Sequence, residues 1–265
     1  MSTEVNQFAQ RLREGIQQIG LFATVSGPAQ LEAFAECGFD WIVIDAEHGS
    51  FELGGVVDAL RALERRHIQA VVRPASNDPV LIKRLLDAGA RTLLIPSVDT
   101  AEQAVQAVAA TRYPPEGIRG VSGQSRAARY GNDTSYVGDA AEGLCVIVQA
   151  ESVAALAELR AIATTPGVDA VFVGPSDLAA SMGHLGDTAH PAVQSAVDDA
   201  LSTLADLGVP RGYLAMQPGE ARKRLAGGVD FLAIATDTSI VIRGVKALEA
   251  EIGRAVRTSE RGRDE

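Results

Sequence analysis

The strongest constraint on the fold of this chain is an alternation, repeated eight times, of short apolar runs and longer amphipathic stretches. Each run spans four to six residues and is mostly continuous in its apolar character. Such runs are typical of parallel strands that are buried on both faces. The predicted strands are Leu21–Val25, Trp41–Asp45, Ala70–Arg73, Thr92–Pro96, Cys145–Ala150, Ala170–Val173, Gly212–Met216 and Phe231–Ala235.

The stretches between these runs have the spacing of amphipathic helices, and one more helix is expected before the first strand. Strand–helix alternation repeated eight times predicts an α/β protein, a (β/α)8 TIM barrel with a leading N-terminal helix. The predicted helices are Val5–Gln17, Ala29–Cys37, Leu53–Arg66, Pro79–Ala88, Ala101–Thr111, Val153–Thr164, Val193–Leu207, Glu220–Ala226 and Ser239–Val256.

The 265 residues are predicted to form one domain over residues 1–256. Parallel barrels routinely use this length as a single domain, and no linker rich in Pro, Gly or Ser divides the chain. Residues 257–265 are a run of charges without apolar anchors, which predicts a disordered tail. Residues 113–143 carry several Gly and Pro without strong periodicity, and a connection of this length suggests a lid or a subunit contact.

Charge and cysteine content limit the partners and the compartment. Lys and Arg number 24 and Asp and Glu number 34, so the net charge is −10 and the mean field repels nucleic acids and anionic membranes. Cys37 and Cys145 both lie in apolar stretches, which predicts two buried thiols in a reducing compartment. No run is long and apolar enough to span a membrane, and no signal peptide is recognisable. These observations predict a soluble cytoplasmic protein.

The second predicted strand ends in an unusual concentration of ionisable side chains. Asp45, Glu47 and His48 share one short turn at the carboxyl end of this strand, where catalytic groups of this fold lie. His48 is suited to general base chemistry near neutral pH, and Asp45 could fix its tautomer. The structural alternative is that Asp45 caps the following helix and that His48 is a solvated loop residue.

Arg73 ends the third predicted strand and is followed by a proline. A guanidinium group in this place is suited to bidentate recognition of a carboxylate. The structural alternative is an ion pair with Asp45 or Glu47.

Two further carboxylates follow neighbouring strands, Glu151 after the fifth and Asp177 after the sixth. Adjacent strands lie ~4.8 Å apart, so these carboxylates can share one cation. Water and substrate oxygens would complete the coordination, as Mg²⁺ and Mn²⁺ prefer. The structural alternative is that Glu151 begins a helix and that Asp177 is an N-cap.

Several other chemistries lack the residues that they require. A Schiff-base lyase needs a lysine inside the barrel, and all three lysines of the chain fall in predicted helices. No glycine-rich phosphate loop follows a strand, and no serine stands in a nucleophile elbow.

The chain resembles the HpcH/HpaI aldolase family of class II pyruvate aldolases, typified by 4-hydroxy-2-oxoheptanedioate aldolase, over nearly its whole length. The resemblance rests on segments that occur in the same order. These are Ile44–His48, Val72–Pro74, Asn77–Pro79, Leu85–Asp87, Arg112–Pro115, Gly117–Val121, Gln149–Glu151 and Gly174–Leu178.

The resemblance implies a TIM barrel and assigns roles to individual residues. Glu151 and Asp177 resemble the ligands of a divalent metal, which would be Mg²⁺, Mn²⁺ or Co²⁺. His48 resembles the proton acceptor, oriented by Asp45, and Arg73 resembles the group that stabilises the enolate-like transition state. The pyruvate contacts implied by the resemblance are Arg73, Gln149, Asp177 and the backbone amide of Ser176.

Asp87 matches a family aspartate that raises the basicity of the catalytic histidine. It ends a helix that returns to the opposite face of the barrel, so we expect it to act from a neighbouring subunit. The resemblance therefore implies a homo-oligomer, and the family favours a hexamer. Phe22 and residues 217–220 depart from the family pattern, and these departures concern the aldehyde specificity.

The predicted activity is reversible, metal-dependent aldol cleavage of 4-hydroxy-2-oxo acids to pyruvate and an aldehyde by a carbon–carbon lyase. One alternative is a lyase of the same superfamily that acts on a CoA thioester, although no basic patch for the nucleotide is evident. A second is a non-catalytic, metal-dependent binder of keto acids. A structural scaffold would leave the polar strand ends unexplained.

Overall fold

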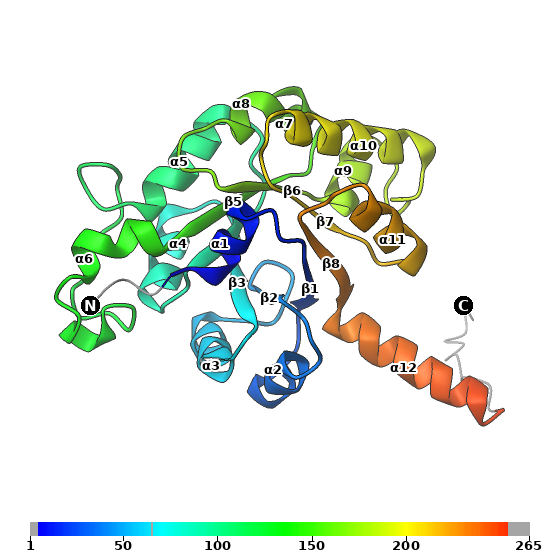
Figure 1. Cartoon of the computed structure of the whole chain (residues 1–265), viewed down its shortest axis with the longest axis horizontal. Helices are drawn as coiled ribbons and strands as arrows, with labels where there is room; N and C mark the ends of the chain where they lie inside the picture. Colours follow the sequence, from blue (N-terminus) through cyan, green and yellow to red (C-terminus); the bar gives the residue numbers. More distant parts are fainter. Residues whose placement is uncertain (1–4, 65, 254–265) are drawn as a thin grey trace, which may run out of the picture.

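Eight parallel strands form a closed barrel in the computed structural model, which describes residues 5–64 and 66–253. Each strand pairs with the next along the chain, and the last pairs with the first (Figure 1). The predicted (β/α)8 fold is confirmed, with strand ends that differ by a few residues. The strands are β1 (Gln18–Ala23), β2 (Trp41–Asp45), β3 (Gln69–Arg73), β4 (Thr92–Ile95), β5 (Cys145–Ala150), β6 (Ala170–Val173), β7 (Arg211–Leu214) and β8 (Phe231–Thr236).

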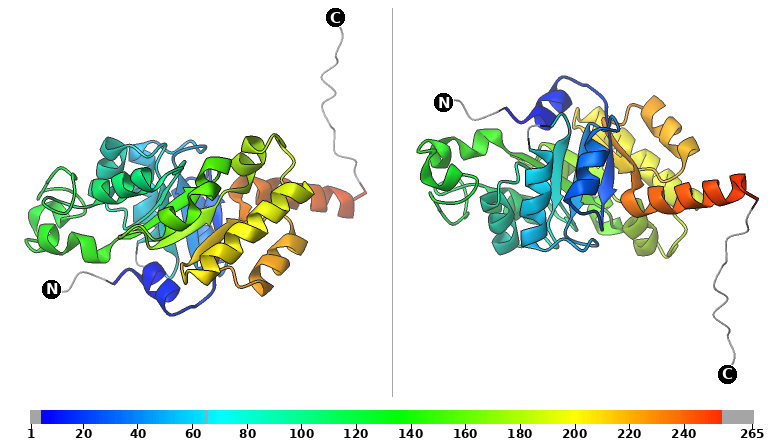
Figure 2. Two further views of the ribbon diagram at one scale, coloured as in Figure 1. Left: turned by 90° about the horizontal axis from the view of Figure 1, so that it is seen from above. Right: turned by 90° about the horizontal axis from the view of Figure 1, so that it is seen from below.

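Helices surround the barrel, and every predicted helix has a counterpart (Figure 2). They are α1 (Gln7–Arg13), α2 (Pro28–Ala35), α3 (Leu53–Leu63), α4 (Pro79–Asp87), α5 (Ala101–Thr111), α6 (Tyr136–Asp139), α7 (Val153–Ala157), α8 (Leu159–Ala163), α9 (Pro175–Ser181), α10 (Pro191–Asp206), α11 (Pro218–Ala226) and α12 (Asp237–Glu251).

Three features of the helices differ from the prediction. The helix expected over residues 153–164 is two short helices, because the backbone of Glu158 leaves the helical conformation between them. The helices α6 and α9 were not predicted, although Pro175 and the acidic Asp177 mark the first turn of α9. The last helix ends at Glu251, and the predicted end at residue 256 and the tail 257–265 lie outside the described residues.

Two apolar layers hold the barrel together. Side chains alternate along a strand, so one set fills the interior and the next set packs against the helices. Phe8 of α1 enters the interior from the end where the strands begin and makes edge contacts with Trp41 and Phe231. Gly20 leaves the space for the Trp41 ring, because a Cβ atom there would lie 2.3 Å from it. The interior therefore closes at the lower end around three aromatic rings.

The long connection between α5 and β5 lies at this same lower end. It contains a 3-10 turn at Arg129–Gly131, α6 and a second 3-10 turn at Ala140–Gly143. Arg126 donates to the carbonyl of Ala88 and to Glu64, at the carboxyl ends of α4 and α3. The connection is therefore remote from the carboxyl ends of its own strands, and the idea of a lid over its own barrel is wrong. A subunit contact remains a prediction.

The two cysteines differ in exposure. Cys145 is buried in the barrel interior, as predicted, whereas Cys37 is exposed. Cys37 lies two residues beyond the end of α2, and its thiol donates to the carbonyl of Ala33 at the surface of that helix. The prediction of two buried thiols is wrong at Cys37 because the apolar stretch ends where the helix does. Among the described residues, no helix is long and apolar enough to cross a membrane.

Candidate active site

The polar side chains of the candidate site are the last inward-facing residues of their strands. The lower inward positions of β2, β3 and β5 are apolar, and the next inward position on each strand is charged or carries an amide. The polar layer therefore lies directly on the apolar interior, at the carboxyl ends of the strands. From bottom to top, the inward residues are Trp41, Val43 and Asp45 on β2, Val71 and Arg73 on β3, and Cys145, Ile147 and Gln149 on β5.

Arg73 is the centre of this layer and is 7% exposed. Its Nε and Nη2 atoms donate to the two carboxylate oxygens of Asp45 at 2.8 and 2.7 Å. Its Nη1 lies 2.9 Å from Oε2 of Glu47 and donates to Oε1 of Gln149 at 3.4 Å. The ring of Phe22 lies beneath the guanidinium, 5.1 Å away. The ion pair considered as the structural alternative is therefore present, with both carboxylates at once.

The surrounding carboxylates keep Arg73 charged despite its burial. Burial lowers the pKa of Arg73, but the hydrogen bonds and charge of Asp45, together with the charge of Glu47, raise it, and the net shift is upward. The site thus contains a fixed positive charge near neutral pH.

Asp45 holds the turn that carries His48 through hydrogen bonds to the backbone of the turn, not through a bond to the His48 side chain. Its Oδ1 accepts hydrogen bonds from the backbone N–H groups of Glu47 and His48 at 3.1 and 3.3 Å. The expected hydrogen bond from the imidazole to Asp45 is not among those of the described residues, because both carboxylate oxygens face Arg73. The His48 side chain is 62% exposed, and its Nε2 lies 3.7 Å from Oε2 of Glu47. His48 is therefore placed at the mouth of the site with a free imidazole edge.

Glu47 lies in the turn that the sequence placed at this strand end, and it forms the ion pair with Arg73 that was considered as an alternative. No catalytic or binding role was assigned to this side chain from the sequence. Burial raises the pKa of Glu47, Arg73 and His48 lower it, and Asp45 and Asp177 raise it again, with a net upward shift. The signal available in the sequence was its position between a strand-end carboxylate and a histidine.

Glu151 is buried and held on both sides. Its Oε1 accepts from the backbone N–H of Ser97 at 2.8 Å, and its Oε2 accepts from Nε2 of Gln149 at 2.8 Å. Burial raises the pKa of Glu151, the bond from Ser97 lowers it, and the charge of Asp177 raises it, so that the net shift is upward. The helix α7 begins at Val153 with Ser152 as its N-cap, so the alternative that Glu151 begins a helix is wrong.

Ser176 and Asp177 lie in the first turn of α9, above the end of β6, and both are exposed. Gly174 is the N-cap of this helix, so the alternative of Asp177 as N-cap is wrong. Asp177 repels Glu151, which places the two carboxylates within electrostatic range of one another. No group of three or more His, Cys, Asp or Glu side chains within residues 5–64 and 66–253 is arranged to hold a metal ion.

Asp87 lies at the carboxyl end of α4, at the lower end of the barrel. It accepts a hydrogen bond from Nη2 of Arg119 at 2.8 Å. Arg119 is 2% exposed and lies over the rings of Tyr113 and Tyr136. Within one chain Asp87 is therefore remote from His48, and sequence reasoning did not identify its partner Arg119.

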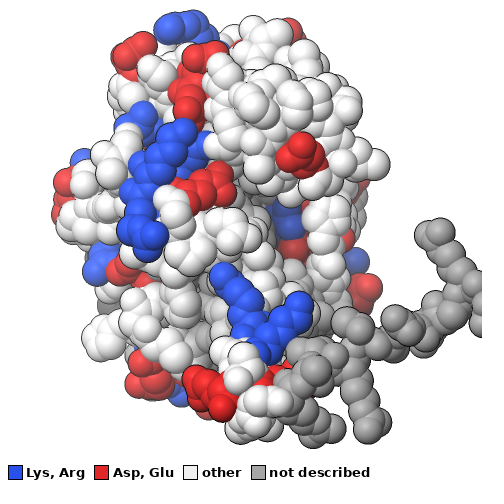
Figure 3. Space-filling view, turned by 90° about the vertical axis from the view of Figure 1, so that its right-hand side faces the viewer, with Lys and Arg blue, Asp and Glu red and all other residues white. Residues whose placement is uncertain are grey.

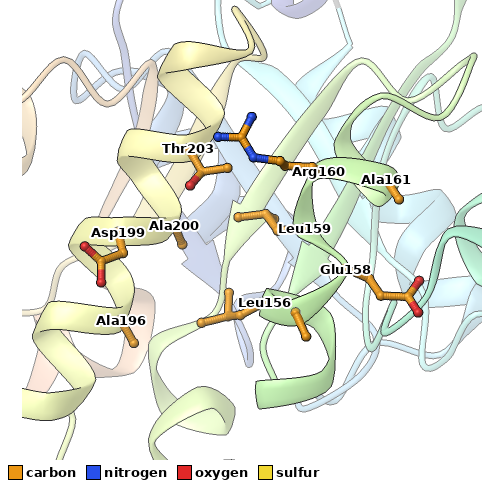
Figure 4. Close-up of a pocket in the computed structure, with 10 residues that line it drawn as sticks. Leu156, Glu158, Leu159, Arg160, Ala161, Ala196, Asp199, Ala200 and Thr203 are labelled. Atoms are coloured by element: carbon orange, nitrogen blue, oxygen red, sulfur yellow. The ribbon is translucent and has the colours of Figure 1, made fainter.

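A groove elsewhere on the molecule has no comparable chemistry. It has a volume of about 560 Å³ and lies between α8 and α10, outside the barrel. Figure 4 shows that its charged side chains do not converge, since Glu158 and Arg160 on one wall point in different directions and Asp199 lies on the facing wall. The convergent polar groups are at the strand ends.

The comparison with known families agrees with this location. Residues 18–244 match the model of the HpcH/HpaI aldolase/citrate lyase family. The chain belongs to this family. Its HpcH/HpaI relatives include a pyruvate aldolase from Rhizobium etli, which is 46% identical over 250 residues, 94% of this chain and 98% of that protein. A 4-hydroxy-2-oxo-heptane-1,7-dioate aldolase from Salmonella arizonae is 43% identical, over 94% of this chain and 95% of that protein.

A crystal structure of an HpcH/HpaI family protein from Burkholderia cenocepacia has the same fold, with a TM-score of 0.91 at 39% identity. The superposition covers 94% of this chain and all of the other. The predicted family is confirmed, and so is the predicted enzyme class, the carbon–carbon lyases.

Proposed function

We propose that this protein is a divalent-metal-dependent aldolase that reversibly cleaves 4-hydroxy-2-oxo acids into pyruvate and an aldehyde. The proposal depends on one observation above all. A fixed guanidinium, a buried carboxylate and an exposed imidazole project from three strand ends of the same barrel face, in Arg73, Glu151 and His48. The names of the relatives support the choice of substrate.

The donor chemistry of the site fits a hard divalent cation. Asp45, Glu47 and Glu151 act on the charge of Arg73, and Asp177 acts on Glu151, so negative charge is in excess over the one guanidinium. Asp45 is neutralised by Arg73, which leaves Glu151 and Asp177 as the pair that repel each other. We propose that these two carboxylates hold Mg²⁺, Mn²⁺ or Co²⁺, with the remaining positions open to water and substrate. The bound cation would supply a Lewis acid beside the oxygens of the 2-oxo acid.

The residues of this chain would then divide the reaction among them. His48 would accept the proton of the 4-hydroxyl group, which lets the C3–C4 bond break and the aldehyde leave. The electron pair of that bond would move towards the C2 carbonyl oxygen, where Arg73 places its positive charge. The amide of Gln149 and the free backbone N–H of Ser176 would orient the pyruvate part. Protonation at C3 then gives pyruvate.

The proposed assembly is a homo-oligomer, with a hexamer as its expected form. Helix α12 projects away from the barrel (Figure 1), and its only buried residue is Asp237, at its beginning. Val241, Ile242, Val245 and Leu248 are 49 to 63% exposed along it. Figure 3 shows this face, on which basic and acidic side chains are interspersed among uncharged ones. An apolar strip of this length is best explained by a second copy of the chain.

The molar mass of the protein, measured by light scattering as it elutes from a size-exclusion column, tests the proposed oligomer. We expect a multiple of the chain mass for the wild type and a smaller mass for the double variant Val245→Asp, Leu248→Asp. A wild type that elutes with the mass of one chain would contradict the proposed oligomer and, with it, the role of Asp87 in a neighbouring site.

Pyruvate release tests the reaction and the metal together. The protein is stripped with a chelator, supplied with 4-hydroxy-2-oxo acids of varied chain length and then given Mg²⁺, Mn²⁺ or Co²⁺. We expect activity to disappear on stripping and to return with metal. Metal-independent release, or no release with any substrate, would contradict the proposal.

Two alternatives are resolved by parallel assays. Cleavage of a CoA thioester would identify the related lyase activity. Tight pyruvate binding without exchange of its methyl protons for deuterium would identify a non-catalytic binder, whereas the proposed aldolase catalyses this exchange.

A further inference from the structure

The carboxylate of Glu151 is held by a residue with an unusual backbone. Ser97 lies two residues beyond β4 and has φ of 55°, in the left-handed region that a serine seldom adopts. Its N–H points at Oε1 of Glu151, at 2.8 Å, and the next N–H, that of Val98, donates to the carbonyl of Gln149 at 3.2 Å. The end of β4 is thus bent onto the end of β5, and the strained residue is the one that reaches the carboxylate.

The opposite side of Glu151 is confined by a glycine. A Cβ atom at Gly174, at the end of β6, would lie 2.5 Å from Oε2 and 2.8 Å from Cβ of Glu151. Any larger residue there would displace the carboxylate. Oε2 also accepts from the Gln149 amide, whose oxygen in turn accepts from Arg73. Oε1 of Glu151 therefore accepts from the N–H of Ser97 and, at 3.4 Å, from its hydroxyl, whereas Oε2 accepts from the Gln149 amide alone.

We propose that Ser97 and Gly174 are positioning residues that orient the Glu151 carboxylate for the divalent cation. This inference rests on the proposed function, because it assumes that Glu151 holds the metal. Strain in the backbone is tolerated where the surrounding structure requires it, and such strain is concentrated at functional sites. Groups that orient a metal ligand typically change metal affinity by about 10- to 100-fold when they are removed.

Two substitutions at Ser97 distinguish the contribution of its backbone N–H to metal affinity from that of its side-chain hydroxyl. Ser97→Gly keeps the N–H and enters the left-handed region freely, so we expect it to keep the wild-type affinity for Mn²⁺. Ser97→Val disfavours this conformation and withdraws the N–H, so we expect affinity to fall by about 10- to 100-fold. The Ser97 hydroxyl is 3.4 Å from Oε1, and equal loss in the two variants would show that the hydroxyl, not the backbone, is responsible and would overturn the proposal.

Substitution at Gly174 provides an independent test if Ser97→Val fails to fold. Gly174→Ala is expected to weaken Mn²⁺ binding by about 10-fold or more, because Glu151 must move. Gly219→Ala is the matched control, since Gly219 lies in the first turn of the helix α11, which follows a strand as α9 does, but has open space around its Cβ position. Equal affinity in the two alanine variants would overturn the role of Gly174.

The measurement is the binding of Mn²⁺ to stripped protein, followed by the electron paramagnetic resonance signal of the free ion, with thermal unfolding as a check on folding. If the wild type does not bind Mn²⁺, or if Glu151→Gln binds it equally well, the proposed metal site itself is wrong. If the wild type binds, Glu151→Gln does not, and both Ser97→Val and Gly174→Ala bind normally, only the present inference fails.

Discussion

Replacing Arg73 with lysine keeps one positive charge above the barrel interior but removes the planar group that joins its neighbours. In the wild type, two nitrogens bind Asp45 at 2.8 and 2.7 Å while the third lies 2.9 Å from Glu47. A lysine ammonium is a compact charge on a flexible four-carbon stem and lacks the planar fork of donors. It can approach Asp45 but cannot reach Glu47 and Gln149 at the same time.

The expected effect on turnover exceeds the effect on stability. With an effective dielectric constant near 20, two opposite unit charges 4 Å apart attract by ~4 kcal/mol. If the lysine charge lies ~2 Å farther from the developing negative charge than the guanidinium does, ~1.4 kcal/mol of this attraction is lost, about 10-fold in rate. Loss of an aligned donor at a site of developing charge typically costs about 10²- to 10³-fold in turnover. We therefore expect Arg73→Lys to lower kcat by about 10³-fold. The free energy of unfolding should fall by only ~1.5–3 kcal/mol, the range for hydrogen bonds to a charged group.

The assay couples pyruvate release to its reduction and is paired with urea unfolding. Arg126→Lys is the matched control, because Arg126 also binds a carbonyl and a carboxylate but lies at the lower end of the barrel. We expect this control to keep wild-type turnover. If Arg73→Lys is folded and turns over at the wild-type rate, charge alone suffices and the reasoning from guanidinium geometry is refuted.

Three further predictions concern proton transfer, stability and metal binding. His48→Ala should lower kcat by about 10²- to 10⁴-fold with little change in urea midpoint, because the side chain is exposed; an equal loss of stability would contradict a catalytic role. Asp237→Asn should lower the free energy of unfolding by several kcal/mol at pH 7, since this buried carboxylate accepts three backbone N–H groups from residues 24–26. Burial raises the pKa of Asp237, but the hydrogen bonds to it lower the pKa by more, so its folded-state pKa lies below the ordinary value. The difference in free energy of unfolding between wild type and Asp237→Asn should therefore be lost as pH falls below ~4. A difference that stays constant with pH would refute this account. Mn²⁺ at ~100 times its Kd should stabilise stripped wild type by ~2.7 kcal/mol and leave Glu151→Gln unchanged in thermal unfolding, and equal stabilisation of both would contradict the metal site.

The order and type of the main elements could be predicted because each parallel strand is buried on both faces and therefore appears as a continuous apolar run. Trp41–Asp45 and Cys145–Ala150 were predicted with their exact ends for this reason. The strand Arg211–Leu214 was placed one to two residues late, since Arg211 begins the strand with a charged residue and Met216 is apolar beyond its end. Sequence patterns locate apolar burial better than they locate backbone pairing.

The candidate site was predictable in its members and less so in its contacts. Strand ends indicated Arg73, Gln149 and Glu151, because the barrel brings these ends together. The sequence left open whether Asp45 would pair with Arg73 or serve its own turn, since an aspartate can face either, and here it does both. The contact from Ser97 to Glu151 could not be predicted, because every residue except proline has a backbone N–H and the residue type does not show which one binds a carboxylate.

The polar layer is costly to the folded state, and that cost helps to explain where the chemistry lies. Glu151 is buried beside another negative charge, and Ser97 has a strained backbone, both at the ends of adjacent strands. Consistent local preferences stabilise a fold, and departures from them are expected where function requires them. Residues just below, such as Ile147, show no such conflict and pack in the apolar interior. The conflicts thus begin at the level of the barrel where the apolar interior ends and a ligand can enter, which is where a bound cation would offset the repulsion between Glu151 and Asp177.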